Sequence, residues 1–78
     1  MSRNVEQSIK ELMSIILNID AAQIDDSTSM DSTPGWDSAN HINLVLALEE
    51  EFSISFEVSE FELMVSFFDI VQVVEAKI

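Results

Sequence analysis

The sequence predicts an all-α fold, a small four-helix bundle of three main helices and one short helix, with a long loop between the first two main helices. Three observations lead to this prediction. Apolar residues recur at helical spacing in three separate segments, and residues that favour helix N-termini stand in front of two of them. A polar stretch that ends in Pro34-Gly35 separates the first segment from the second. With 78 residues, the chain is expected to form one domain, residues 1–78.

The first main helix is predicted over residues 5–17. Its apolar residues are spaced three or four positions apart: Val5, Ile9, Leu12, Met13 and Ile16. Residues 18–36 are rich in Asp, Ser and Thr and are predicted to be a loop, pinned to the core by Ile19, Ile24 and Met30. Because a connection this long without secondary structure is uncommon in a small domain, we expect it to have a functional reason.

The second main helix is predicted from Ser38 to about Phe52. Asp37 precedes it as the expected N-cap, because its carboxylate can accept hydrogen bonds from the free amides of the first turn. Ser38 is then the first helical residue, with its hydroxyl toward solvent. One arc of the helix carries large apolar residues and is predicted to face the core: Leu44, Val45, Leu48 and Phe52.

A second arc of this helix mixes apolar and polar residues on the side of Ser38. Its predicted members are Ala39, Ile42, Asn43, Leu46, Glu49 and Glu50. Exposed apolar residues beside acidic ones are common on protein-binding surfaces, so we expect this arc to dock basic partner proteins. The acidic run 49–51 also has a simpler interpretation, in which it is only a solvated face.

The C-terminal third is predicted to contain one short and one longer helix. Residues 53–58 alternate polar and apolar and could form a short strand, while residues 59–63 can make one short helix. Ser66 and Asp69 form a capping box for a last helix. Its inward residues are expected to be Phe67, Ile70, Val71, Val74 and Ile78. The β-branched valines favour a strand locally, but no second long strand is predicted for it to pair with.

Charge limits the partners. Fifteen acidic residues against three basic ones give a formal net charge of −12, which disfavours nucleic acid and anionic membranes and favours basic protein surfaces. The absence of cysteine excludes disulfides and thiolate metal sites. The N-terminal segment resembles neither a signal peptide nor a membrane span, so the protein is expected in the cytoplasm. We also expect it to be a monomer.

Two patterns suggest chemistry that we do not expect. His41 is the only histidine and follows Ser38 by three residues, but it falls on the core arc, which predicts a partly buried structural role and no catalytic residue. The run Asp25, Ser27, Ser29 and Asp31 resembles the early ligands of a calcium loop. Met30 stands where that loop needs glycine and Trp36 where it needs glutamate, so no metal site is predicted.

The segment around Ser38 resembles the acyl carrier proteins. Their attachment signature is Asp-Ser-Leu in front of a helix that ends in acidic residues and Phe, and residues 37–39 through 47–52 align with it without a gap. The resemblance extends from about Val5 to Ile78. It implies that Ser38 receives a 4′-phosphopantetheine arm from coenzyme A through a phosphopantetheinyl transferase with Mg²⁺, and that the arm's thiol carries acyl intermediates as thioesters. In this interpretation Asp37 also contacts the transferase or a metal ion.

The resemblance further implies a protein that is not itself an enzyme. Its partners would be acyl- or aminoacyl-loading ligases and synthases with basic docking surfaces, in fatty acid, polyketide or related biosynthesis. It also favours a loop over a strand at residues 53–58, with Ile54 and Phe56 inward. The interior expected to shelter part of a short acyl chain comprises Leu44, Val45, Leu48, Ile54, Phe56 and Phe61.

The chain departs from the family pattern near Ser38. Trp36 replaces a small residue, Ala39 replaces leucine, and Asn40 and Asn43 replace frequent acids. For Trp36 we expect packing across the loop first and partner contact second. These departures favour a specialised carrier over one that serves the general fatty acid synthase. Two alternatives remain: an aminoacyl or peptidyl carrier loaded by an adenylating ligase, and an unmodified acidic helical interaction module.

Overall fold

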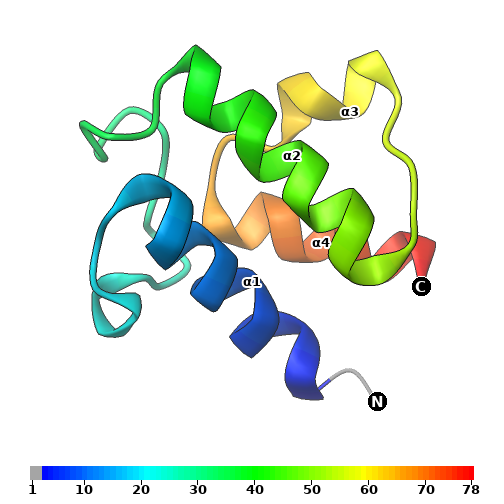
Figure 1. The fold of residues 1–78 in the computed structure, drawn as a ribbon, viewed down its shortest axis with the longest axis horizontal. Helices are drawn as coiled ribbons and strands as arrows, with labels where there is room; N and C mark the ends of the chain where they lie inside the picture. Colours follow the sequence, from blue (N-terminus) through cyan, green and yellow to red (C-terminus); the bar gives the residue numbers. More distant parts are fainter. Residues whose placement is uncertain (1–2) are drawn as a thin grey trace.

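The structure is a computed structural model that describes residues 3–78. Its elements are α1 (Arg3–Leu17), the short 3₁₀ helix η1 (Ala21–Gln23), α2 (Ser38–Phe52), α3 (Val58–Leu63) and α4 (Phe67–Lys77). Three longer helices and one short one are therefore present, as predicted, and Figure 1 shows the long connection between α1 and α2 at one end of the molecule. Within the described residues, no helix is both long enough and apolar enough to cross a lipid bilayer.

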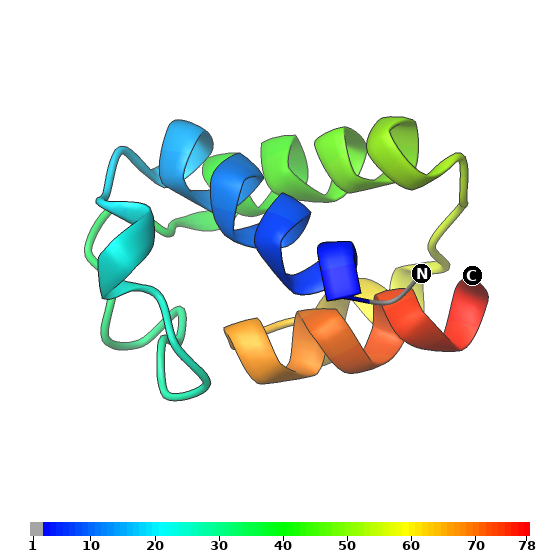
Figure 2. The ribbon, with the colours of Figure 1, turned by 90° about the horizontal axis from the view of Figure 1, so that it is seen from below.

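The core lies where α1 packs against both α2 and α4 (Figure 2). Apart from Leu17, its helical members come from the predicted apolar stripes: Val5, Ile9, Met13 and Leu17 of α1, Leu44, Val45 and Leu48 of α2, and Phe67, Ile70, Val71 and Val74 of α4. The predicted Leu12 and Ile16 of α1 are half-buried and pack against this core. Phe52 is only half-buried at the end of α2. The apolar stripes therefore face the core as their spacing predicts, because residues three or four apart share one side of a helix.

The connection over residues 18–36 is more ordered than predicted. The Asp20 side chain accepts a hydrogen bond from the Ala22 amide at 3.0 Å, which caps η1. Further along, the Met30 amide donates to the Val65 carbonyl at 2.9 Å and the Phe67 amide donates to the Thr28 carbonyl at 2.9 Å. These bonds tie the loop to the link between α3 and α4, in addition to the predicted anchors Ile19, Ile24 and Met30.

Residues 53–57 form a loop that turns Phe56 into the core, so the strand alternative for this segment is wrong. The loop leads into α3, which begins at Val58, one residue earlier than predicted. The cause is Glu60, whose Oε1 accepts the Glu57 amide at 2.8 Å and so completes the cap. At α4, the Ser66 hydroxyl accepts a hydrogen bond from the Asp69 amide at 3.1 Å. This is one of the two bonds of the predicted capping box, the one made by the N-cap side chain.

Two other sequence predictions need correction. The first helix begins at Arg3, two residues before the predicted start. Ile78 was expected to face inward, yet 58% of it is exposed. It lies beyond Lys77, the last residue of α4, so no helical turn holds its side chain against the core.

Candidate functional site

Ser38 is the first residue of α2, as predicted, and its side chain is exposed to solvent. Among residues 5–78, no group forms a hydrogen bond with its hydroxyl. The turn that carries Ser38 lies where the loop from α1 enters α2 (Figure 1). Ser38 therefore presents a free hydroxyl at a helix N-terminus, which can be reached by another protein.

Asp37 is the N-cap of α2, which confirms the structural role predicted for it. Its Oδ1 accepts a hydrogen bond from the Asn40 amide at 2.9 Å, and its carbonyl accepts the His41 amide at 2.8 Å. The second bond is the first regular bond of the helix, so of the four amides that a helix leaves free at its start, those of residues 37–40, the Asp37 side chain takes that of Asn40. The amides of Ser38 and Ala39 are the ones left at the tip of the helix.

The turn before Asp37 is held close to α1. The Asn40 side chain donates from Nδ2 to the Gly35 carbonyl at 2.8 Å. A Cβ atom at Gly35 would lie 2.8 Å from the Leu17 carbonyl oxygen, a distance that real Cβ contacts do not show. Glycine is therefore required at position 35 by the close approach of the α1 backbone.

Trp36 is buried, with 2% of its surface exposed, which confirms that it packs across the loop. Its indole Nε1–H donates to His41 Nδ1 at 3.0 Å, and the two ring centroids are 6.1 Å apart. The other ring nitrogen, His41 Nε2, lies 2.9 Å from the Phe61 carbonyl oxygen of α3. His41 is half-buried, and both its nitrogens are engaged away from Ser38, so the predicted structural role of His41 is confirmed.

Sequence reasoning missed that Trp36 and His41 form a pair. With Asp37 as N-cap, Trp36 occupies the position before the cap and His41 the fourth helical position, which are the two positions that contact each other in a hydrophobic staple. That spacing was a usable signal. The contact to Phe61, twenty residues further along the chain, had no comparable signal in the sequence.

The arc predicted to bind partners is mostly exposed. Ile42 and Leu46 are 50% and 56% exposed, although both are large apolar residues. Ala39, Asn43 and Glu50 are exposed as well. These five residues lie along α2 beside Ser38 and are open to a partner.

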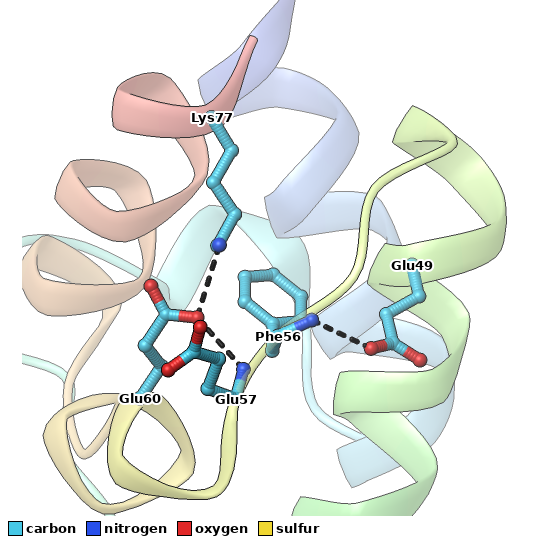
Figure 3. Close-up of polar contacts among 5 residues, drawn as sticks. All are labelled: Glu49, Phe56, Glu57, Glu60 and Lys77. Carbon is cyan, nitrogen blue, oxygen red and sulfur yellow. Dashed lines mark hydrogen bonds and ion pairs between the residues drawn. The ribbon is translucent and has the colours of Figure 1, made fainter.

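Glu49 differs from the rest of the predicted arc. It is half-buried, and its Oε2 accepts the Phe56 amide at 2.8 Å (Figure 3). The carboxylate therefore holds the loop that follows α2, while its negative charge remains on the same side of the helix as Glu50. A structural role for Glu49 was absent from the sequence interpretation because Phe56 is seven residues away and outside the helix.

The same corner contains an ion pair. Lys77 Nζ lies 3.0 Å from Glu60 Oε1 and 5.8 Å from the centroid of the Phe56 ring (Figure 3). The hydrogen bond from the Glu57 amide, together with Lys77, holds the pKa of Glu60 below its ordinary value. These contacts join the end of α4 to the start of α3.

The calcium-like run forms a local turn. Asp25 Oδ1 accepts the Ser27 amide at 2.9 Å and the Ser27 hydroxyl at 2.6 Å, and these bonds lower the pKa of Asp25. The carboxylate is thus used in an Asx turn, the usual role of aspartate in such loops.

Comparison with known proteins identifies the family to which this arrangement belongs. The sequence profile of the family described as "Phosphopantetheine attachment site" matches residues 7–72. The chain belongs to the acyl carrier proteins. It is 35% identical over 72 residues to the acyl carrier protein of Clostridium acetobutylicum, covering 92% of this chain and 94% of that one. It is 32% identical over 69 residues to the acyl carrier protein of Helicobacter pylori, covering 88% of each.

A solved structure supports the same fold. The holo acyl carrier protein of Geobacter metallireducens superimposes with a TM-score of 0.83 at 23% identity, covering 95% of this chain and 85% of that one. As an acyl carrier protein, the chain carries a covalent 4′-phosphopantetheine group and is a carrier, not a catalyst. That group supplies the thiol to which acyl groups are bound as thioesters. The exposed hydroxyl at the N-terminus of α2 fits it, because free amides at a helix start favour a phosphodiester.

Proposed function

We propose that Ser38 is the attachment point of the phosphopantetheine arm. The observation that carries this proposal is the free, exposed Ser38 hydroxyl at the first position of α2, directly after the capping Asp37. On attachment, a bond forms between Ser38 Oγ and the phosphorus of coenzyme A that bears the pantetheine arm, the pyrophosphate bond of coenzyme A breaks, and adenosine 3′,5′-bisphosphate leaves. The hydroxyl proton passes to a base on the transferase, since no side chain of residues 5–78 is a hydrogen-bond partner of the Ser38 hydroxyl.

The local field supports this role. The Asp37 side chain takes up the amide of Asn40, and the amides of Ser38 and Ala39 remain at the tip of α2. The partial positive charge of a helix N-terminus stabilises an attached phosphodiester. Because Trp36 and Asn40 hold the turn on both sides of Asp37, the hydroxyl is presented in a fixed position.

The test is intact mass after incubation with coenzyme A, Mg²⁺ and a broad-specificity phosphopantetheinyl transferase. The wild type is expected to gain the mass of one arm, and Ser38→Ala is expected to gain none. Ser55→Ala, at an exposed serine in the loop after α2, is the matched control and should be modified like the wild type. An unmodified wild type, beside a positive control carrier that is modified, would overturn the proposal.

We further propose that the α2 arc of Ala39, Ile42, Asn43, Leu46, Glu49 and Glu50 docks basic partners, namely the transferase and the ligases or synthases that load and use the arm. The exposed Ile42 and Leu46 supply apolar contact, and Glu50 supplies charge for electrostatic steering. Since Glu49 holds the Phe56 amide, Glu50 is the cleaner position to test.

Glu50→Lys is expected to lower the kcat/KM of arm transfer at low salt, mainly through KM, because it reverses a charge on the docking arc. Glu75→Lys changes the net charge equally at an exposed position of α4 and is expected to have little effect. Circular dichroism should show the same helical content in both variants. Equal losses in both variants would mean that only the overall charge matters.

We infer that the protein is a specialised carrier that acts in the cytoplasm as a single-domain monomer, in fatty acid, polyketide or related biosynthesis. The support is the docking arc itself, where Ala39 and Asn43 are exposed and uncharged in positions where the family often has leucine and acids. Such a surface suits a narrower set of partners. Recovering the holo protein from cells and identifying its thioester by mass spectrometry would distinguish acyl from aminoacyl cargo.

A further inference from the structure

A chain of two hydrogen bonds connects the turn that carries Ser38 to helix α3. Trp36, at the end of the loop, donates to His41 in the first turns of α2, and His41 reaches the carbonyl of Phe61 near the end of α3. The two bonds measure 3.0 and 2.9 Å. One imidazole therefore links the loop, α2 and α3, and it lies one helical turn from Ser38.

These partners determine the protonation of His41. The indole Nε1–H of Trp36 is only a donor, so His41 Nδ1 must accept and carries no proton. The Phe61 carbonyl is only an acceptor, so His41 Nε2 must donate. The bridge is complete only with the neutral imidazole that has its hydrogen on Nε2. A second proton would place an N–H on Nδ1, facing the N–H of Trp36.

We propose that His41 is a positioning residue for arm attachment, which in its neutral form holds the Ser38 turn and α3 in register and releases Trp36 when it is protonated. This inference rests on the proposed attachment at Ser38. Because a proton on Nδ1 removes the acceptor for the Trp36 indole, acid is expected to break the bridge. Presentation of Ser38 to the transferase is expected to weaken as the pH falls.

Three carboxylates lie beside the bridge in the chain: Asp37 one turn earlier, and Glu60 and Glu62 on either side of Phe61. None of them is a hydrogen-bond partner of the imidazole, because both ring nitrogens are taken by Trp36 and Phe61. Asp37 caps α2, and Glu60 is paired with Lys77 of α4. Because a proton on His41 Nδ1 and the bond from Trp36 exclude each other, protonation and loss of the Trp36 bond occur together.

The first experiment does not depend on arm attachment. The chain contains one tryptophan and one histidine, so their ring resonances are unambiguous in ¹⁵N NMR of the unmodified protein. At pH 7.5 we expect His41 Nδ1 to be unprotonated and Nε2 protonated. Between pH 7.5 and 5, the Trp36 indole N–H resonance is expected to shift and to exchange faster with solvent. A proton on Nδ1 at pH 7.5, or an indole resonance that does not respond to pH, would overturn the proposal.

The second experiment measures arm transfer. For each carrier, the kcat/KM of the transferase at pH 7.5 is divided by its kcat/KM at pH 5.5. The ratio obtained with each variant is then compared with the ratio obtained with the wild type. Because the same transferase acts on all of them, its own pH dependence cancels in this comparison. The net value of one hydrogen bond predicts a wild-type ratio about three- to tenfold above that of His41→Gln, whose amide can donate and accept but does not titrate. Trp36→Phe, which lacks the indole donor, is expected to lower the ratio in the same way.

The modification rates of two His41 variants separate a positioning role of His41 from a role in folding. At pH 7.5, His41→Ala is expected to be modified more slowly than the wild type, and His41→Gln is expected to restore most of the rate. If His41→Gln does not fold, Trp36→Phe supplies the same comparison. A wild type that is never modified refutes the attachment at Ser38. If the wild type is modified, and its ratio of kcat/KM at pH 7.5 to that at pH 5.5 equals the ratios of His41→Gln and Trp36→Phe, only the role of His41 is refuted.

Discussion

The two ends of α2 are held by different kinds of contact. At the N-terminal end, Trp36 is buried and the bonds from Asp37 and Asn40 reach residues no more than five positions away. At the C-terminal end, the Glu49 carboxylate accepts the Phe56 amide of the loop that follows, and nearby the Glu60–Lys77 ion pair joins α3 to α4. Burial and close packing therefore fix the end that presents Ser38, whereas the half-buried carboxylate of Glu49 holds the far end. Perturbing the first end should therefore lower the free energy of unfolding more, while the contacts of charged residues near the second end should weaken in acid and in high salt.

The largest effect is expected at Trp36. Truncation of a buried tryptophan to alanine removes its packing and leaves a cavity, so Trp36→Ala should lower the free energy of unfolding by about 3–5 kcal/mol. Urea denaturation followed by circular dichroism measures the loss. Ile15→Ala is the control, because Ile15 is 77% exposed on α1, and it should change stability by less than about 0.5 kcal/mol.

A loss of that size approaches the whole stability of a small domain, so Trp36→Ala can be largely unfolded in water. Trp36→Phe keeps an aromatic ring in the core and should remain folded with a smaller loss. If Trp36→Ala and Ile15→Ala had equal denaturation midpoints, the burial of Trp36 would not be what holds the N-terminal end of α2.

The next largest effect is expected at Gly35. In Gly35→Ala the new methyl group would lie 2.8 Å from the Leu17 carbonyl oxygen, so either the turn or the end of α1 must move. Overpacking of this kind costs about 1–3 kcal/mol. The urea midpoint should fall, and the Gly35–Asn40 bond should weaken with it. An unchanged midpoint would show that the turn accommodates the methyl group and is looser than these contacts indicate.

At the other end of α2, Glu49→Ala should cost about 1 kcal/mol, because it leaves the Phe56 amide without its acceptor. Glu50→Ala is the matched control on the same helix and should cost less than about 0.5 kcal/mol, since Glu50 is exposed. Thermal unfolding of both variants at one ionic strength gives the comparison. Equal losses would mean that Glu49 acts only through its charge.

The smallest effect concerns Glu60. Its pKa in the folded protein lies below the ordinary value of about 4.5, so its contribution to stability is present above that value and is lost as the pH falls through the lower, folded-state pKa. Glu60→Gln should therefore unfold at a slightly lower temperature than the wild type at pH 7. The difference should shrink below about pH 4.5 and in high salt. A difference that persists under both conditions would point to packing instead of charge.

Much of the fold could be predicted from local patterns. The spacing of Leu44, Val45 and Leu48 identified the buried face of α2, and Asp37 before Ser38 marked its start. Errors arose at chain segments whose structure depends on distant residues. Residues 18–36 were predicted to lack regular structure, but their bonds to Val65 and Phe67 order part of the loop. Such bonds leave no periodic signal in the sequence.

By itself, the sequence determined that this chain is a small acidic helical domain with a serine behind a helix cap, because helix periodicity, caps and charge are local properties of the chain, while its resemblance to the acyl carrier proteins indicated a carrier. Only the tertiary structure decided what surrounds that serine. It placed Trp36 and Phe61 on the two nitrogens of His41, and it turned Glu49 toward a loop amide. The physical reason is that a hydrogen bond depends on distance and direction between atoms, and folding brings atoms together from positions that are far apart in the chain.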